Sequence, residues 1–149
     1  MLAKKADAPF DSEQHFFEIK WDGIRGLAFI EAGRLRLQSR QLLDITPQFP
    51  ELACLKRLPA GTVLDGELVV LRQGKPTLLE IQRRALLQDR RRIQWLSRSM
   101  PVTYMVFDLV YLKSKPLMAE TLSVRRQALE NLIQQTRLPG VLVPVVLSI

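Results

Sequence analysis

The sequence predicts an α+β fold in which antiparallel sheets carry flanking helices. Stretches with alternating or continuous apolar residues indicate strands, and stretches with apolar residues at helical spacing indicate helices. Asp-Gly and Ala-Gly turns at 22–23 and 32–33 separate neighbouring strands by the short distances typical of hairpins. The chain has 149 residues, of which 47% are hydrophobic, which suits one domain with its own core. The expected order is three strands, helix, strand, helix, strand, helix, strand.

The N-terminal part of the chain predicts a β-meander. Strands are expected at 16–20, 26–31 and 34–40. The third strand alternates strictly, so that Leu35 and Leu37 share one face. Because the first strand ends at Lys20, the meander is expected to begin with this lysine.

A short helix and an apolar strand are expected next. Thr46-Pro47 resembles an N-cap followed by proline at the first helical position. The apolar stripe of this helix consists of Leu52, Leu55 and Leu58. The strand at 62–71 is apolar on both sides of Asp65-Gly66-Glu67, which predicts a buried or cleft-facing carboxylate at Glu67. The alternative is a strand bulge at Gly66 with the flanking acids at the sheet edge.

The C-terminal half predicts two helices and two strands. Helical spacing runs through 78–95, and a strand is expected at 102–112 around a single carboxylate, Asp108. Ser123 is expected to cap the second helix, and 142–147 indicates a last strand. The core stripe of that second helix consists of Ala128, Leu129, Leu132 and Ile133.

The charge of the chain favours a polyanionic partner. Lys and Arg total 22 against 15 Asp and Glu, which gives a formal net charge of +7 and a pI near 10.1. Arginines between 83 and 92 follow the predicted helix and are suited to a phosphate backbone. The alternatives are a basic protein whose charge only serves solubility and a solvated basic helix face.

Cysteine content and hydropathy indicate the compartment. Cys54 is the only cysteine, so the chain has no intrachain disulfide and no cysteine cluster for zinc, which points to a reducing environment. Residues 1–9 contain no apolar run of signal-peptide length, and the apolar stretch 141–147 is broken by Pro144 and too short to span a bilayer. We therefore expect a cytoplasmic protein without membrane contact.

Lys20 is the residue around which the candidate chemistry is arranged. A lysine can attack phosphorus only as the free amine, and an ordinary lysine is neutral in about one molecule in a thousand at neutral pH. We expect burial beside other cations, such as Arg25, to lower the pKa of Lys20. The alternative is a surface lysine before an Asp-Gly turn.

Four ordered motifs resemble those of the covalent nucleotidyltransferases. They are Lys20 to Arg25 (Lys-x-Asp-Gly-x-Arg), Ser39-Arg40, Asp65-Gly66-Glu67 and Val106 to Leu109. The chain resembles the adenylation domain of an ATP-dependent DNA ligase, and is most similar to the bacterial end-joining type. The resemblance implies a partial, ATP-grasp-like nucleotidyltransferase fold, with ATP and Mg²⁺ or Mn²⁺ as cofactors.

The resemblance also implies roles around the nucleotide. Lys20 is the nucleophile that takes AMP from ATP as a phosphoamide. Glu18 contacts the adenine edge, and Ile19 lies beside it in the nucleotide site. Phe107 stacks on the adenine ring, and Arg25 binds the ribose or phosphate side.

Further residues are implied at the phosphates and at the DNA. Arg40 binds the phosphate region and the 5′-phosphate of the nick, and Glu67 binds the ribose or a divalent metal. Asp22 and Asp108 are expected to orient their neighbours. Arg83 and Arg84 are expected, with Arg40, to contact the DNA, which is a nicked duplex. End-joining proteins such as Ku are further expected partners.

The chain also departs from the family pattern. Residues 1–149 are expected to form the N-terminal two-thirds of the adenylation domain, without the later Glu-Gly and Lys-x-Lys motifs and without the OB-fold. Lys113-Ser114-Lys115 has matching letters but stands in a turn. We therefore expect this chain alone to be weakly active or inactive, as a truncated gene product or with a partner chain that completes it.

Two other functions remain open from the sequence. An RNA ligase or an mRNA capping nucleotidyltransferase shares the Lys-x-Asp-Gly motif. A non-catalytic nucleic-acid-binding remnant would keep the basic surface after losing catalytic parts.

Overall fold

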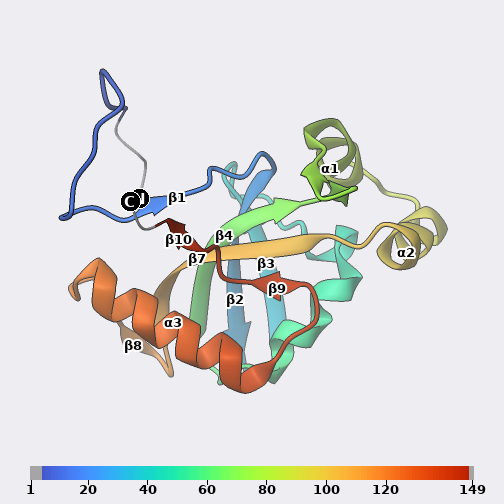
Figure 1. Cartoon of the computed structure of the whole chain (residues 1–149). Coiled ribbons are helices and arrows are strands. Elements are labelled where there is room, and N and C mark those ends of the chain that lie inside the picture. The colour runs from blue at the N-terminus through green and yellow to red at the C-terminus, as the bar shows by residue number, and fades with distance from the viewer. Residues whose placement is uncertain (1–4, 148–149) are drawn as a thin grey trace.

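The computed structural model describes residues 5–147 and is built on one mixed sheet. The strands are β1 (Phe17–Glu18), β2 (Ile24–Glu31), β3 (Arg34–Ser39), β4 (Thr62–Val69), β5 (Leu71–Arg72), β6 (Lys75–Pro76), β7 (Thr103–Leu112), β8 (Lys115–Pro116), β9 (Val141–Leu142) and β10 (Val146–Leu147). The helices are the 3₁₀ helices η1 (Thr46–Gln48) and η2 (Pro50–Arg57) and the α-helices α1 (Leu78–Ala85), α2 (Arg90–Ser99) and α3 (Leu122–Thr136). The main sheet has the order β3-β2-β4-β7-β8, and β9 also pairs with β7 (Figure 1).

The predicted α+β class with antiparallel pairing is confirmed. β2 pairs antiparallel with β3 and β4, and β4 pairs antiparallel with β7, whereas the short pair β7–β9 is parallel. The strands expected at 34–40, 62–71 and 102–112 match β3, β4 and β7 to within two residues. Their period-2 apolar patterns are strong, so local sequence suffices to place them.

One face of the sheet is covered by helices and forms the core. Ala28, Ile30 and Leu64 are fully buried on this face. They belong to one apolar cluster with Leu52 of η2, Ile81 of α1 and Leu129 of α3. In β2, alternation sends Arg25, Leu27 and Phe29 to the opposite face, where they are only half-buried. That opposite face carries the candidate site.

β4 and β7 approach each other closely, and the pairing shifts beside Gly66. Asp65 pairs with Asp108 and Gly66 with Val106, so Phe107 is an extra residue in β7. A Cβ atom at position 66 would lie 2.5 Å from the backbone oxygen of Met105, so only glycine fits here. The strand bulge that was considered as an alternative at Gly66 therefore exists, but the bulged residue belongs to the neighbouring strand.

The first strand was wrongly placed in the meander. β1 is only two residues long and pairs with β10, as Phe17 opposes Leu147 (Figure 1). The strands β2, β3 and β4 are neighbours without it. Lys20 consequently lies in an irregular segment between β1 and β2 and not at the end of a sheet strand.

The segment after β3 is helical as expected, but it forms two 3₁₀ helices in place of one short helix. It consists of η1 and η2, with Ile45 and Phe49 as the residues before them, so Thr46 is not the cap. The Thr46 hydroxyl instead accepts the Leu37 N–H at 2.7 Å and donates to Asp44 at 2.6 Å. The predicted stripe of Leu52, Leu55 and Leu58 is buried as expected.

The helix expected at 78–95 is two helices. α2 starts after Asp89, whose carboxylate accepts the backbone N–H groups of Arg91 and Arg92 at 2.8 and 3.2 Å. This N-cap begins a new helix, so the continuous helical pattern of the sequence corresponds to two separate helices.

The boundaries of the C-terminal elements also differ from those expected. α3 is capped by Thr121 and not by Ser123, because the Thr121 hydroxyl accepts the Val124 N–H. The last strand is divided into β9 and β10, with Pro144 between them. In the described part of the chain, no helix is long and apolar enough to cross a membrane.

Candidate active site

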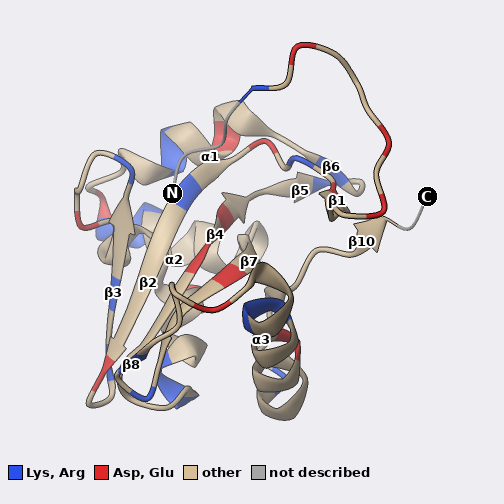
Figure 2. Cartoon of the chain, turned by 90° about the vertical axis from the view of Figure 1, so that its left-hand side faces the viewer, with Lys and Arg blue, Asp and Glu red and all other residues tan. Residues whose placement is uncertain are grey.

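Three sequence-predicted residues meet on the sheet face opposite the core. Arg25 of β2 directly opposes Glu67 of β4, and such opposed residues point to the same side. The guanidinium of Arg25 lies 5.7 Å from the ring centre of Phe107, the bulged residue of β7. The acidic positions of β4 and β7 stand in the middle of the sheet (Figure 2). Three strands distant in sequence thus present one surface.

Arg25 is fixed in place by Asp65. The carboxylate accepts a two-pronged contact, with Nε to Oδ1 at 2.9 Å and Nη2 to Oδ2 at 2.5 Å. The side chain of Asp65 is only 7% exposed, and its hydrogen bond raises the pKa of Arg25 above the ordinary value. The guanidinium is therefore a permanent, oriented cation on this surface.

Glu67 is a half-buried carboxylate whose surroundings act on its pKa in opposite directions. Burial raises its pKa above the ordinary value, while the charges of Lys20 and Arg25 and the Gly23 backbone N–H act to lower it. Lys20 and Glu67 are therefore close enough to influence each other. The Gly23 backbone N–H donates to this carboxylate, so Glu67 lies next to the turn that follows the candidate nucleophile.

The environment of Lys20 differs from the one expected. Its side chain is 87% exposed, and Nζ donates to Oδ1 of Asp22 at 3.0 Å. The hydrogen bond to Asp22, then the charge of Asp22, raise the pKa of Lys20, and Glu67 adds to the effect. The expected depression of the pKa by burial and by Arg25 is wrong, because Lys20 is exposed and its neighbours are acids.

Of the two residues before Lys20, Glu18 is bound to α3 and Ile19 is exposed to solvent. Glu18 pairs with Arg126, which also donates to the Pro144 carbonyl oxygen and, at 2.7 Å, to Glu130. Ile19 is 54% exposed. One buried arginine thus ties the segment before Lys20 to α3 and to the chain before β10.

Asp108 has a structural contact. Its carboxylate receives Nε and Nη2 of Arg125 at 2.7 and 3.0 Å and also accepts the Leu109 N–H. This pair attaches the start of α3 to β7. Arg40 is exposed in the turn after β3, next to Ser39, which opposes Gly26.

The two arginines expected at the DNA have opposite surroundings. Arg83 is exposed, whereas the side chain of Arg84 is 1% exposed. Arg84 donates to Glu51 at 2.7 Å and to the carbonyl oxygens of Gln48 and Met100 at 3.1 and 3.0 Å. A DNA contact by Arg84 is therefore wrong, because a buried guanidinium with these partners cannot reach a phosphate.

Arg125 and Arg126 form buried ion pairs that the sequence reasoning did not predict. Both are buried in α3, where they precede Leu129 and Leu132 on the core stripe at three- and four-residue spacing. Arginine at a core position needs a carboxylate or carbonyl partner. That pattern is the signal that would have found them.

The residues present fit a magnesium ion that is shared with a nucleotide. Among residues 5–147 there is no group of three or more His, Cys, Asp or Glu side chains suited to a metal. Asp65 is occupied by Arg25, which leaves Glu67 as the available carboxylate. Mg²⁺ is commonly bound by one or two carboxylates together with substrate phosphates.

Comparison with known proteins gives one consistent family. A family model described as ATP dependent DNA ligase domain matches residues 1–143. The chain is 35% identical over 137 residues to a probable DNA ligase of Koribacter versatilis, covering 89% of this chain and 23% of that protein. It is 36% identical over 134 residues to the multifunctional non-homologous end joining DNA repair protein LigD of Mycobacterium tuberculosis, covering 88% and 16%.

Two solved structures agree. The ligase domain of M. tuberculosis LigD has a TM-score of 0.70 at 34% identity, and a mycobacterial DNA ligase D complexed with ATP and MES has 0.67 at 32%. Each match covers 89% of this chain and 40% of the other. The chain thus spans less than half of the solved chains and less than a quarter of the curated relatives quoted above. By the family match over 1–143 and these likenesses, the chain belongs to the ATP-dependent DNA ligase domain family.

Proposed function

We propose that this chain binds ATP and transfers AMP to Lys20, as the nucleotide-binding part of a DNA ligase adenylation domain. The observation that carries the proposal is that Arg25 of β2, Glu67 of β4 and Phe107 of β7 meet on one sheet face, next to the turn that follows Lys20. An aromatic ring can stack on a base, and an oriented cation can stabilise the charge that develops on the phosphates during the transfer.

The proposed reaction forms one bond and breaks another. The Nζ lone pair of Lys20 attacks the α-phosphorus of ATP, the bond to the bridging oxygen breaks, and pyrophosphate leaves with the bonding electrons. The amine must lose a proton in the process. Because Asp22 and Glu67 raise its pKa, Lys20 is an ammonium at neutral pH, and we expect slow transfer by the 149-residue chain.

We assign the other groups by the resemblance to the family. Phe107 stacks on the adenine ring, and Glu18 and Ile19 line the adenine edge next to Lys20. Arg25, oriented by Asp65, faces the ribose or the phosphates. Glu67 would hold Mg²⁺ or Mn²⁺ together with the phosphates, and the ion when bound supplies charge neutralisation there.

The proposed acceptor of the AMP is the 5′-phosphate of a nicked DNA duplex. Exposed Arg40, at the end of β3, and exposed Arg83 are the proposed phosphate contacts. Their affinity for DNA should fall steeply with salt. An end-joining protein such as Ku is a proposed partner, because one relative is named as a non-homologous end joining protein.

Calorimetric titration with ATP and Mg²⁺ tests the nucleotide site. Phe107→Ala should weaken ATP binding roughly 5- to 100-fold, since stacking on an aromatic side chain contributes about 1–3 kcal/mol per base. Phe107→Tyr should retain binding. Phe29→Ala is the matched control, because Phe29 lies on the same sheet face but is covered by Arg36 at 4.2 Å. Equal ATP affinity in Phe107→Ala and Phe29→Ala, or no ATP binding at all, contradicts the proposal.

A further inference from the structure

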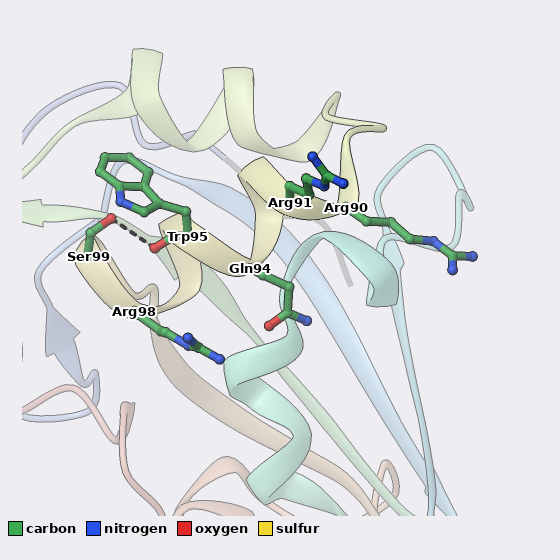
Figure 3. Close-up of a pocket in the computed structure, with 6 residues that line it drawn as sticks. All are labelled: Arg90, Arg91, Gln94, Trp95, Arg98 and Ser99. Carbon is green, nitrogen blue, oxygen red and sulfur yellow. Dashed lines mark hydrogen bonds between the residues drawn. The ribbon is translucent and has the colours of Figure 1, made fainter.

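The outward half of α2 combines an exposed tryptophan with arginines. At 100° per residue, Arg90, Arg91, Trp95 and Arg98 fall on one half of the helix, and Ile93 is buried on the other. Trp95 is 65% exposed, although tryptophan is normally well buried. Figure 3 shows Trp95 and Arg98 toward the Ser99 end of α2 and Arg90 and Arg91 toward its start.

Trp95 stands between two hollows. The first has a volume of about 590 Å³ and is lined by Arg90, Arg91, Gln94, Trp95, Arg98 and Ser99. The second, of about 520 Å³, lies between α2 and β5 and includes Arg72 and Thr103. A planar ligand beside the indole therefore has room on this surface.

The arginines of this face are free to meet an anion. Among residues 5–147, no salt bridge joins Arg90, Arg91 or Arg98 to a carboxylate. The nearest acid in sequence, Asp89, is used by the backbone N–H groups at the start of α2. Cations without partners around an exposed aromatic ring suit a ligand that has both phosphates and planar bases.

This composition favours a nucleic acid over a membrane. A helix that lies on a membrane exposes a broad apolar face, whereas the apolar face of α2 is turned into the protein at Ile93. Trp95 is the one large apolar side chain among the residues that line the first hollow. A base can stack on an indole only when it is not already stacked within a duplex, so the strand must be unpaired.

The position of α2 relates this surface to the candidate active site. α2 leads into β7, and Thr103 at the start of β7 opposes Val69 of β4. Gly23, in the turn after Lys20, also lies against β4, because a Cβ atom added to Gly23 would touch Val69 and Leu68. The turn after Lys20 and the start of β7 are therefore about two strand spacings, or roughly 10 Å, apart. Arg84 holds the Met100 carbonyl oxygen at the end of α2, which fixes the helix to the body.

We propose that the outward face of α2 binds an unpaired DNA strand, with a base stacked on Trp95 and phosphates on Arg90, Arg91 and Arg98. This surface is separate from the nucleotide site and would take unpaired nucleotides next to a strand break. The choice of DNA rests on the proposed function, whereas the stacking and the phosphate contacts rest on α2 itself.

The test uses the 149-residue chain and a fluorescently labelled 12-nucleotide single strand, followed by anisotropy. Trp95→Ala should weaken binding roughly 5- to 100-fold, and Trp95→Phe should stay close to the wild type. The double variant Arg91→Gln, Arg98→Gln should reduce the slope of log affinity against log salt by about 0.7 per lost contact. Arg34→Gln, at the exposed start of β3, is the control and should leave affinity and slope unchanged beyond a general charge effect.

Several results would overturn the proposal. One is equal binding of the single strand by Trp95→Ala and by the wild type. Others are tighter binding of a 12-base-pair duplex or of an RNA 12-mer than of the DNA single strand. The last is that polyglutamate or anionic phosphatidylserine vesicles bind as tightly as the DNA single strand. Circular dichroism checks that each variant is folded. ATP titration of Trp95→Ala separates the two proposals, because this variant should bind ATP normally. Single-strand binding through Trp95 without any ATP binding would refute the proposed function and leave this surface standing.

Discussion

Replacing Arg84 by methionine should destabilise the protein strongly without removing a DNA contact. The guanidinium is 1% exposed and satisfies Glu51, the Gln48 carbonyl oxygen and the Met100 carbonyl oxygen. Glu51, whose side chain is 14% exposed, would keep only the Val102 N–H at 2.9 Å. The variant therefore leaves a nearly buried carboxylate without its countercharge.

The expected magnitude follows from this geometry. Removing one partner of a buried ion pair costs about 3–5 kcal/mol, out of a total of about 5–15 kcal/mol for a typical domain. At about 2–4 °C per kcal/mol for a domain of this size, the melting temperature should fall by roughly 6–20 °C. The matched variant Arg83→Met, one residue earlier on the exposed side of α1, should change the stability by less than about 0.5 kcal/mol.

Urea unfolding followed by far-UV circular dichroism measures the difference. Adding Glu51→Gln to Arg84→Met should recover part of the loss, because the uncompensated charge disappears. A loss below about 1 kcal/mol for Arg84→Met would refute the reasoning. So would a variant of normal stability that has lost its affinity for DNA, since Arg84 would then act at the surface.

Two further predictions concern the active site and the sheet beneath it. The initial rate of AMP transfer should rise about tenfold per pH unit between pH 7 and 9, because Asp22 raises the pKa of Lys20 and the neutral amine is the minor form. Intact mass spectrometry measures this rate. A rate that is constant over this range would contradict the assignment of Lys20 as the nucleophile. Gly66→Ala should lower the free energy of unfolding in urea by about 1–3 kcal/mol, because the added Cβ would lie 2.5 Å from the Met105 oxygen. Gly26→Ala, whose added Cβ has its nearest contact at 3.4 Å, should lower it less. Equal stability of the two variants would show that β4 and β7 can separate freely.

The sequence predicted those parts of the fold that local pattern determines. Alternation in 34–40 and the apolar runs of β4 and β7 placed three central strands. The pairing of β1 with β10 could not be found in this way, because the two strands are far apart in sequence and only two residues long. The division between α1 and α2 was visible in principle, since Asp89 is a strong N-cap residue within a continuous helical pattern.

The sequence predicted which residues to group at the candidate site, but it did not predict the electrostatic surroundings of Lys20. Motif order singled out Lys20, Arg25, Glu67 and Phe107, and the structure brings Arg25, Glu67 and Phe107 to one surface next to the turn that follows Lys20. The exposure of Lys20 depends on the path of the chain before β2, which no local pattern specifies. The burial of Arg84 likewise depends on Glu51, more than thirty residues earlier in the chain.

Locating an AMP adduct on the chain is the most direct test of the central claim. The protein is incubated with ATP and Mg²⁺ at pH 9, where more of the amine is neutral, and is then digested with trypsin and sequenced by tandem mass spectrometry. We expect a gain of one AMP on Lys20, in a peptide 6–25 that trypsin no longer cuts at this residue. The adduct should be absent in Lys20→Ala and present in Lys75→Ala. An adduct that persists in Lys20→Ala, or one that forms on another lysine of the wild-type chain, would contradict the assignment of Lys20 as the nucleophile.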